Sequence, residues 1–194
     1  MRRRTFDALA TGAGLVLAII LLVAGSLLMW GHSFVDSQVH RQLAAQKIVF
    51  PAKNSPAIKA PEFQAMHQYA GQLMTTGAQA EVYADHFIAN HLKEIGGGQT
   101  YAQLSAKSLA QPNNTKLAGQ VATMFKGETL RGLLLNAYAF GKMGEIALWG
   151  AIASFIGAGL LLVLSVFGVA HLRRTSPTAE VFSKIATTDK VATS

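Results

Sequence analysis

The 194-residue chain contains no cysteine, and this absence excludes several classes of protein. Disulfide frameworks, zinc–thiolate sites and iron–sulfur clusters all depend on cysteine sulfur. A lipoprotein anchor also needs a cysteine, and Ser26 occupies the position where that residue would follow the run Leu22–Gly25. We therefore expect neither covalent cross-links nor thiolate-bound cofactors.

Charged residues make up only 14% of the chain, and two long stretches contain none of them. Residues 8–31 and 146–170 also lack histidine, and each stretch exceeds the roughly 20 residues that cross about 30 Å of hydrocarbon. These lengths predict two transmembrane helices. Because neither stretch holds an ionisable group, transport or a proton relay by this chain alone is not expected.

The first stretch has a second interpretation, a removable signal peptide, because three arginines precede it. Its 24 uncharged residues exceed the roughly 7–15 of a signal-peptide core, so we predict an uncleaved anchor. The run Arg3–Phe6 also weakly resembles a twin-arginine export signal. The preference of arginine for the cytoplasmic side explains the same residues without export.

The basic residues that flank the two stretches predict how the chain is oriented in the plasma membrane. Arg2, Arg3 and Arg4 before the first span, and Arg173 and Arg174 after the second, favour cytoplasmic placement of both termini. Trp30 and Trp149 near the other ends suit the headgroup level on the outer side. The predicted plan is a cytoplasmic segment 1–7, a span 8–31, an extracytoplasmic domain 32–145, a span 146–170 and a disordered cytoplasmic tail 171–194.

The formal net charge of +7 does not indicate nucleic-acid binding. The terminal segments 1–7 and 171–194 hold seven of the 17 basic residues but only three of the ten acidic ones, so much of the excess is a topology signal. No basic run with interleaved aromatic residues is present. We expect membrane lipid, and no nucleic acid, among the partners.

Glycine and proline divide the middle of the chain into predicted helices, and the fold class is an all-α membrane protein. A glycine run at 96–98 ends one helix, because glycine reaches left-handed geometry. A turn at 112–114 begins the next, because asparagine caps a helix start. A proline-ended segment, 47–51, predicts a short extended piece. The predicted helices are a continuation of the first span over 33–46, then 62–74, 79–95, a short helix near 100–109, and a last helix from 115 that runs into the second span as a stalk.

Small residues recur at every fourth position in both spans, which lets helix backbones approach closely in lipid. Such stripes pair the two helices of one chain or bind other membrane subunits, and both readings stay open. One stripe is Ala10, Gly14 and Ala18; the other is Gly150, Ser154 and Ala158, with Ala153 and Gly157 beside it.

Residues with the chemistry of a catalytic or metal centre are few and poorly spaced. His86 and His91 are five apart, which separates them by roughly 140° on a helix, whereas a helical zinc pair prefers a spacing of four. No nucleophile elbow, phosphate loop or dinucleotide fingerprint is present. We therefore predict no catalytic, metal or cofactor residues, although a loose polar cluster of Asp85, His86, His91 and Glu94 with His67 remains an alternative.

Polar residues at two places on the predicted stalk carry separate expectations. Glu128 and Arg131 have the spacing of an intrahelical ion pair, and an alternative is that Arg131 meets a partner or a lipid phosphate. Asn136 interrupts an apolar run and is expected to hydrogen-bond across to another helix.

Four blocks of the sequence, Gln42–Pro51, Ala84–His91, Gly97–Ala102 and Leu130–Leu134, resemble a family of small two-pass membrane proteins. These proteins are common in actinobacterial genomes and are often automatically labelled aromatic ring-opening dioxygenase. This chain departs from them by a longer insertion around 66–79 and a longer tail. The most specific block pairs a histidine with a glycine-rich turn: His91, Gly97, Gly98, Thr100, Tyr101 and Ala102, with Arg131 in the last block.

The resemblance implies a membrane location and the same order of anchor, outer domain and anchor. A ring-cleaving dioxygenase would need an iron site, commonly two histidines and a carboxylate around open positions. The spacings in this chain do not assemble such a site.

Three hypotheses for function follow from the sequence. The first is a non-enzymatic accessory subunit or interaction module of a cell-envelope membrane complex, with other membrane subunits or a second copy as partners. The second is a sensor-like extracytoplasmic ligand-binding module. The third is a membrane-anchored metal-dependent enzyme that uses His67, His86 and His91.

Overall fold

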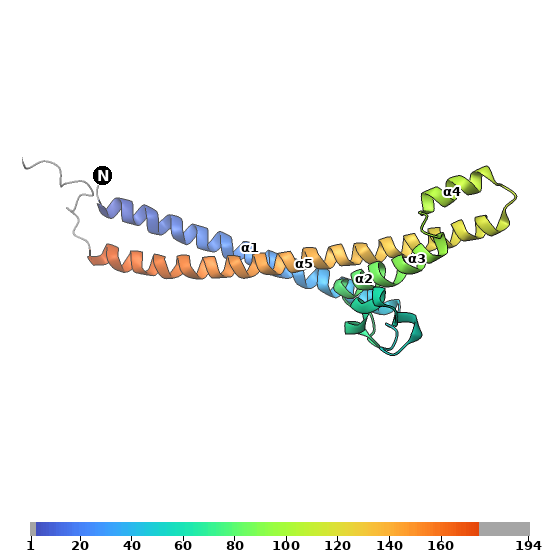
Figure 1. The fold of residues 1–194 in the computed structure, drawn as a ribbon. Helices are drawn as coiled ribbons and strands as arrows, with labels where there is room; N and C mark the ends of the chain where they lie inside the picture. The colour runs from blue at the N-terminus through green and yellow to red at the C-terminus, as the bar shows by residue number, and fades with distance from the viewer. Residues whose placement is uncertain (1–2, 175–194) are drawn as a thin grey trace, which may run out of the picture. The chain divides into compact units, whose positions relative to one another are not determined.

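The computed structural model describes residues 3–174 and is almost entirely helical (Figure 1). In these residues the β pairing is a single antiparallel bridge between Val49 and Leu73. Most of the predicted tail, from Thr175 on, lies outside the described residues. The elements are α1 (Arg3–Ala45), the 3-10 helices η1 (Pro56–Ile58) and η2 (Pro61–Tyr69), α2 (Gly77–Val82), the π-helical η3 (Tyr83–Ile88), α3 (Ala89–Gly96), α4 (Tyr101–Ala110) and α5 (Thr115–Arg174).

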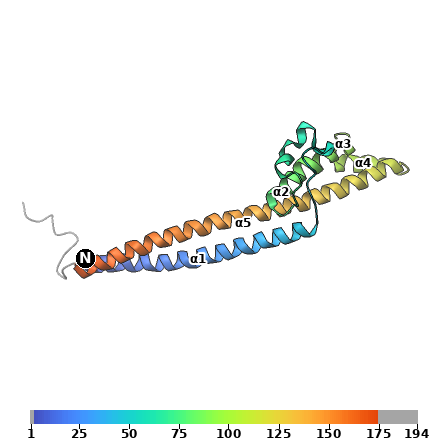
Figure 2. The ribbon, with the colours of Figure 1, turned by 90° about the horizontal axis from the view of Figure 1, so that it is seen from below.

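The chain divides into two compact units, and each unit takes part of α1 and part of α5. The first unit, called the helix pair below, comprises residues 3–30 and 148–174 of the described chain. The second, called the helical domain, comprises residues 31–147. Figures 1 and 2 show α1 and α5 running side by side in the helix pair. Both helices are long and apolar enough to cross a membrane.

Capping residues explain where the helices of the helical domain begin and end. Thr76 and Thr100 each cap a helix start, and each exchanges hydrogen bonds with a glutamine three residues later, Gln79 and Gln103. The Asn114 side chain accepts a hydrogen bond from the Leu117 amide at the start of α5. Gly97, at φ 58°, ends α3 in the left-handed conformation. The predicted helix ends at 96–98 and 112–114 are confirmed.

Two predicted helices differ from the structure. The helix expected over 62–74 is a 3-10 helix that ends at Tyr69, because Gly71, at φ 74°, turns the chain back toward Phe50. The backbone then pairs with 48–50, which confirms the short extended piece expected at 47–51. The helix expected over 79–95 is present from Gly77 to Gly96, but a π-helical segment interrupts it at Tyr83–Ile88.

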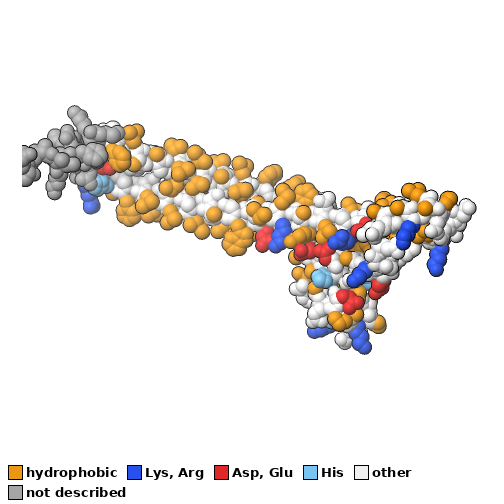
Figure 3. Space-filling view, turned by 45° about the horizontal axis from the view of Figure 1, so that its top comes forward, with side chains coloured by type: hydrophobic (Ala, Val, Ile, Leu, Met, Phe, Trp, Pro, Cys, Tyr) orange, Lys and Arg blue, Asp and Glu red, His pale blue; other side chains and the backbone are white. Residues whose placement is uncertain are grey.

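The core of the helical domain forms where the loop segment 48–76 packs against the helices. Phe50, Ile58, Met66 and Met74 are almost completely buried, and Phe50 contacts the Tyr69 and Tyr83 rings with centroids 5.4 Å away in both cases. The core cluster also includes buried residues of α1, α2 to α5 and η3: Leu43, Ala80, Ala84, Ile88, Leu92, Leu104, Met124 and Leu134. Figure 3 shows the charged side chains of the described residues gathered mainly on the helical domain, whereas apolar side chains cover the helix pair.

We predict that a larger residue at position 77 destabilises the helical domain, because α2 approaches the backbone of α5 there. A Cβ atom on Gly77 would lie 3.0 Å from the Ala137 carbonyl oxygen and 3.1 Å from the Tyr138 Cα. The substitution Gly77→Ala should therefore lower the free energy of unfolding by about 1–3 kcal/mol. Gly132→Ala is the matched control, since a Cβ there meets open space and alanine favours an exposed helix by up to about 1 kcal/mol. Thermal unfolding of the full chain in mild detergent, followed by circular dichroism, measures both. Equal midpoints for the two variants would contradict the prediction.

Candidate functional site

Small side chains form the face that the two helices of the helix pair share. Ala18, Ala151 and Ala158 are completely buried. A Cβ atom on Gly14 would lie 3.1 Å from Ser165 Oγ, and one on Gly25 would lie 2.9 Å from the Phe155 ring. The helices are thus antiparallel and close, and their backbones leave little room for larger residues.

Large apolar side chains point away from this shared face. Ile20, Val23 and Leu164 are each more than half exposed, and so are Val166 and Phe167. Only 11% of the most apolar 18-residue window of each long helix is buried. The arrangement is the inverse of a helix pair that folds in water, in which the large apolar residues lie inside.

The residues of the two predicted stripes take different places in the helix pair. Ala18 and Ala158 are buried, Gly14, Gly150 and Ser154 are half-buried, and Ala10 is exposed. The Ser154 hydroxyl donates a hydrogen bond to the Gly150 carbonyl oxygen in its own helix, at 2.8 Å. Of the neighbouring stripe, Gly157 faces Leu21, whereas Ala153 is exposed.

Sequence reasoning missed several residues of the shared face because the burial repeats every seven positions, not every four. On α5 the buried positions Ala151, Ala158 and Ser165 follow one another at intervals of seven. On α1 the corresponding series is Thr11, Ala18 and Gly25, all of them buried or half-buried. A seven-residue spacing is the signal of coiled-coil packing, and it was readable in the sequence.

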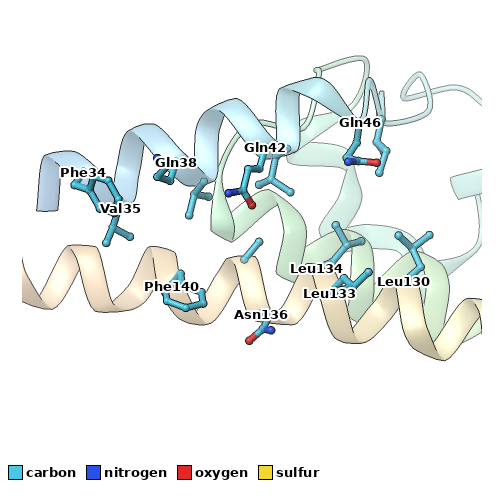
Figure 4. Close-up of a pocket in the computed structure, with 14 residues that line it drawn as sticks. Phe34, Val35, Gln38, Gln42, Gln46, Leu130, Leu133, Leu134, Asn136 and Phe140 are labelled. Carbon is cyan, nitrogen blue, oxygen red and sulfur yellow. The ribbon is translucent and has the colours of Figure 1, made fainter. Parts of the chain in front are cut away.

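An apolar groove lies in the helical domain between the last turns of α1 and the middle of α5. Its volume is about 580 Å³. Gln42 points from α1 toward α5, and Leu130 and Leu134 point from α5 toward α1 (Figure 4). The groove is lined by apolar residues and four amides: Phe34, Val35, Gln38, Val39, Gln42, Leu43, Gln46, Ile48, Leu130, Leu133, Leu134, Asn136, Ala137 and Phe140.

Asn136, which we expected to hydrogen-bond to another helix, lies exposed in the groove lining. The other three amides, Gln38, Gln42 and Gln46, are spaced by four along α1 and so share one wall. No ionisable side chain lines this groove.

The block that carries the family resemblance forms the corner between α3 and α4. Gly97 and Gly98 take positive φ angles, 58° and 76°, that end α3, and Thr100 caps α4. The Tyr101 ring packs on Phe125, with ring centroids 5.7 Å apart. Each of these residues therefore has a conformational or packing role in the corner.

His91 lies within a row of rings and not in an open site. Its Nδ1 donates a hydrogen bond to the Phe87 carbonyl oxygen at 2.7 Å, and its ring centroid lies 4.4 Å from Phe87 and 5.8 Å from Phe63. The row continues from Phe87 to Tyr83, with ring centroids 4.8 Å apart. Burial raises the pKa of Tyr83 above its ordinary value, because the phenolate form loses hydration there.

Arg131 joins α5 to the π-helical segment through Asp85. The Arg131 Nη2 atom lies 2.8 Å from Asp85 Oδ1, and its Nη1 atom lies 3.8 Å from Glu128 Oε2. The intrahelical pair expected between Glu128 and Arg131 is therefore present as the longer contact, and Asp85 is the nearer partner. Spacing along one helix could not have revealed a partner 46 residues away.

The remaining histidines do not converge on a shared centre. His67 Nε2 donates to the Ile58 carbonyl oxygen at 2.8 Å, and His86 is half-buried in the π-helical segment. Within residues 3–174, no group of three or more His, Asp or Glu side chains is placed to hold a metal ion. The loose cluster proposed from the sequence around His67, His86 and His91 is thus not assembled as a ligand set.

We predict that cysteines introduced at positions 14 and 165 form a disulfide within one chain. A Cβ added to Gly14 would lie 3.1 Å from Ser165 Oγ. The two positions are therefore close enough for a disulfide, in which the Cβ atoms are about 3.5–4.5 Å apart. The chain has no other cysteine, so Gly14→Cys with Ser165→Cys gives an unambiguous readout after mild oxidation. Mass spectrometry of the digested protein should find the linked peptides.

The control for that experiment is Gly12→Cys with Ser165→Cys, since Gly12 faces open space. It should give no linkage within the chain. Disulfide-linked dimers from the 14–165 variant on a non-reducing gel would instead indicate that these small residues pair between chains.

No protein family, curated protein or solved structure that we compared with this chain matches it. The resemblance to the actinobacterial two-pass family stays a prediction. Function must therefore be inferred from the helix pair, the groove and the helical corner themselves.

Proposed function

We propose that this chain is a two-pass protein of the plasma membrane whose helical domain is a non-enzymatic interaction module, an accessory part of a cell-envelope membrane complex. Both termini are cytoplasmic in this proposal, and residues 32–145 lie outside. The observation that carries it is the inverted helix pair, with small residues inside and large apolar residues outside.

The energetics of hydration support the membrane placement. Among the described residues of the helix pair, 21 large apolar side chains are exposed. Removal of one such side chain from water is worth about 1.5–3 kcal/mol, so exposure of all of them to water would cost on the order of tens of kcal/mol. Lipid removes that cost, and the small shared face then supplies the packing that holds helices together where no hydrophobic force acts between them.

The placement of titratable groups supports the same arrangement. Between Ala8 and Trp30, and between Leu148 and Ala170, no side chain is ionisable. At the ends of the two helices Asp7 and His171 lie near one another, with Asp7 Oδ2 3.8 Å from His171 Nε2. Polar groups thus collect at the level expected for the cytoplasmic membrane surface, beside Arg173 and Arg174.

An interaction module is favoured over an enzyme because several polar residues of the helical domain that could carry chemistry are held in structural contacts. His67 and His91 bond to backbone carbonyls, Asp85 and Arg131 pair, and Thr76 and Thr100 cap helices. The domain also leaves apolar surface open, including the groove between α1 and α5. Open apolar surface suits binding. The same groove favours the second candidate, a ligand-binding module.

We predict that single cysteines report the proposed orientation. Ala52 is exposed in the loop of the helical domain, and Ser183 belongs to the tail. A membrane-impermeant maleimide added to intact cells should label Ala52→Cys and should label Ser183→Cys only after permeabilisation. The cysteine-free parent chain is the control for background labelling. Labelling of residue 183 but not residue 52 in intact cells would refute the orientation.

The proposed accessory role predicts that the full chain is extracted from native membranes as part of a complex. Mild-detergent extraction, size-exclusion chromatography and cross-linking should find it in a species larger than one chain with its detergent. A variant with the groove filled, Leu133→Trp, should shift that species toward the monomer if the groove binds the protein partner. Recovery of the unmodified chain only as a monomer, at native expression levels, would speak against the accessory role.

A further inference from the structure

The groove in the helical domain is open and runs along the last turns of α1. It extends along α1 from Phe34 to Gln46, which at about 1.5 Å per residue is about 18 Å. Its volume of about 580 Å³ falls within the range of roughly 300–1,000 Å³ that small-molecule sites occupy.

The chemistry of the lining favours a hydrocarbon chain. Ten of the 14 lining residues are apolar, and Leu133 and Phe140 remain 62% and 52% exposed because nothing in the described chain covers them. The polar lining groups are amides, which can hydrogen-bond to ester carbonyls or hydroxyls without a charge. The lack of any ionisable group means that a charged ligand would have no counter-charge in the groove.

The lining residues lie close in sequence to the two predicted spans. Phe34 comes three residues after the span 8–31, and Phe140 comes six residues before the span 146–170. The length of the groove is close to that of one acyl chain, since each leaflet contributes about half of a hydrocarbon core about 30 Å thick.

We propose that the groove holds one acyl chain of a bilayer phospholipid, drawn out of the outer leaflet between α1 and α5. This inference rests on the proposed membrane placement and assigns the ligand of the same groove. The apolar walls take the chain, and Gln38, Gln42 and Gln46 line the side where ester oxygens can accept hydrogen bonds from amide nitrogens. A protein partner that binds through the groove would have to displace the lipid.

The test uses the full chain reconstituted in vesicles of phosphatidylcholine and phosphatidylglycerol that contain a trace of phosphatidylcholine with a diazirine at the end of one acyl chain. After illumination, mass spectrometry locates the labelled peptides. We expect label in the two apolar stretches, 8–31 and 146–170, and also in the groove peptides around 130–140. Gln42→Trp, which fills the groove from an exposed position, should lower the groove label by about tenfold, the effect of two lost methylene contacts.

Gln64→Trp is the matched control, because Gln64 is also an exposed glutamine of the helical domain but does not line the groove. It should leave the groove label unchanged, and unchanged thermal unfolding will show that both variants fold. Label in the two stretches without label at 130–140 would overturn the acyl-chain site while leaving the membrane proposal intact. Label in neither would overturn the membrane proposal. Cross-links from groove residues to a second copy of the chain would replace the lipid by a self-association surface.

Discussion

The structure of the helix pair depends on one constraint, the size of the side chains that the two helices share. Alanine, glycine, serine and threonine at intervals of seven let the backbones of α1 and α5 approach until a Cβ on Gly25 would touch the Phe155 ring. In water this choice would forfeit most of the hydrophobic stabilisation, because the large residues are turned outward. In lipid it is the favourable choice, since large residues gain nothing from contact with each other that lipid tails do not supply.

The helical domain is stabilised by the opposite rule, with its large side chains inside. Phe50, Met66 and Met74 are buried under the loop segment, and a row of rings from Phe63 through His91 and Phe87 reaches Tyr83 and Phe50. Ring contacts at these centroid distances add to simple area burial. The contrast between the two units is the one expected of a chain with one part in lipid and another in water. This contrast supports the proposed division into membrane and outer segments.

Much of the helical pattern was predictable from local signals, whereas the site was not. Apolar length predicted the two long helices, and caps such as Thr100, Asn114 and Gly97 marked where helices begin or end. The π-helical segment was not predicted because the spacing of apolar residues does not reveal a single widened turn. The Asp85–Arg131 pair and the groove depend on which segments meet in space, and a single sequence does not report contacts between residues 46 or 90 positions apart. The seven-residue repeat was readable, but a search for small residues at every fourth position found only part of it.

The seven-residue spacing can be followed along the sequence from the shared face into the residues of the groove. On α5 the series Ser165, Ala158, Ala151 and Gly144 continues, seven residues at a time, to Ala137 and Leu130 in the groove. On α1 the series Thr11, Ala18, Gly25 and His32 continues to Val39 and Gln46. Most of the groove-lining residues are larger than the small residues of the shared face, and Ala137 is the exception. Longer side chains generally hold packed helix axes farther apart, and flexible glutamines pack less completely than branched apolar residues. An open groove is therefore expected where glutamine, leucine and phenylalanine take the place of glycine and alanine, and an apolar occupant is a natural complement to the large residues that line it.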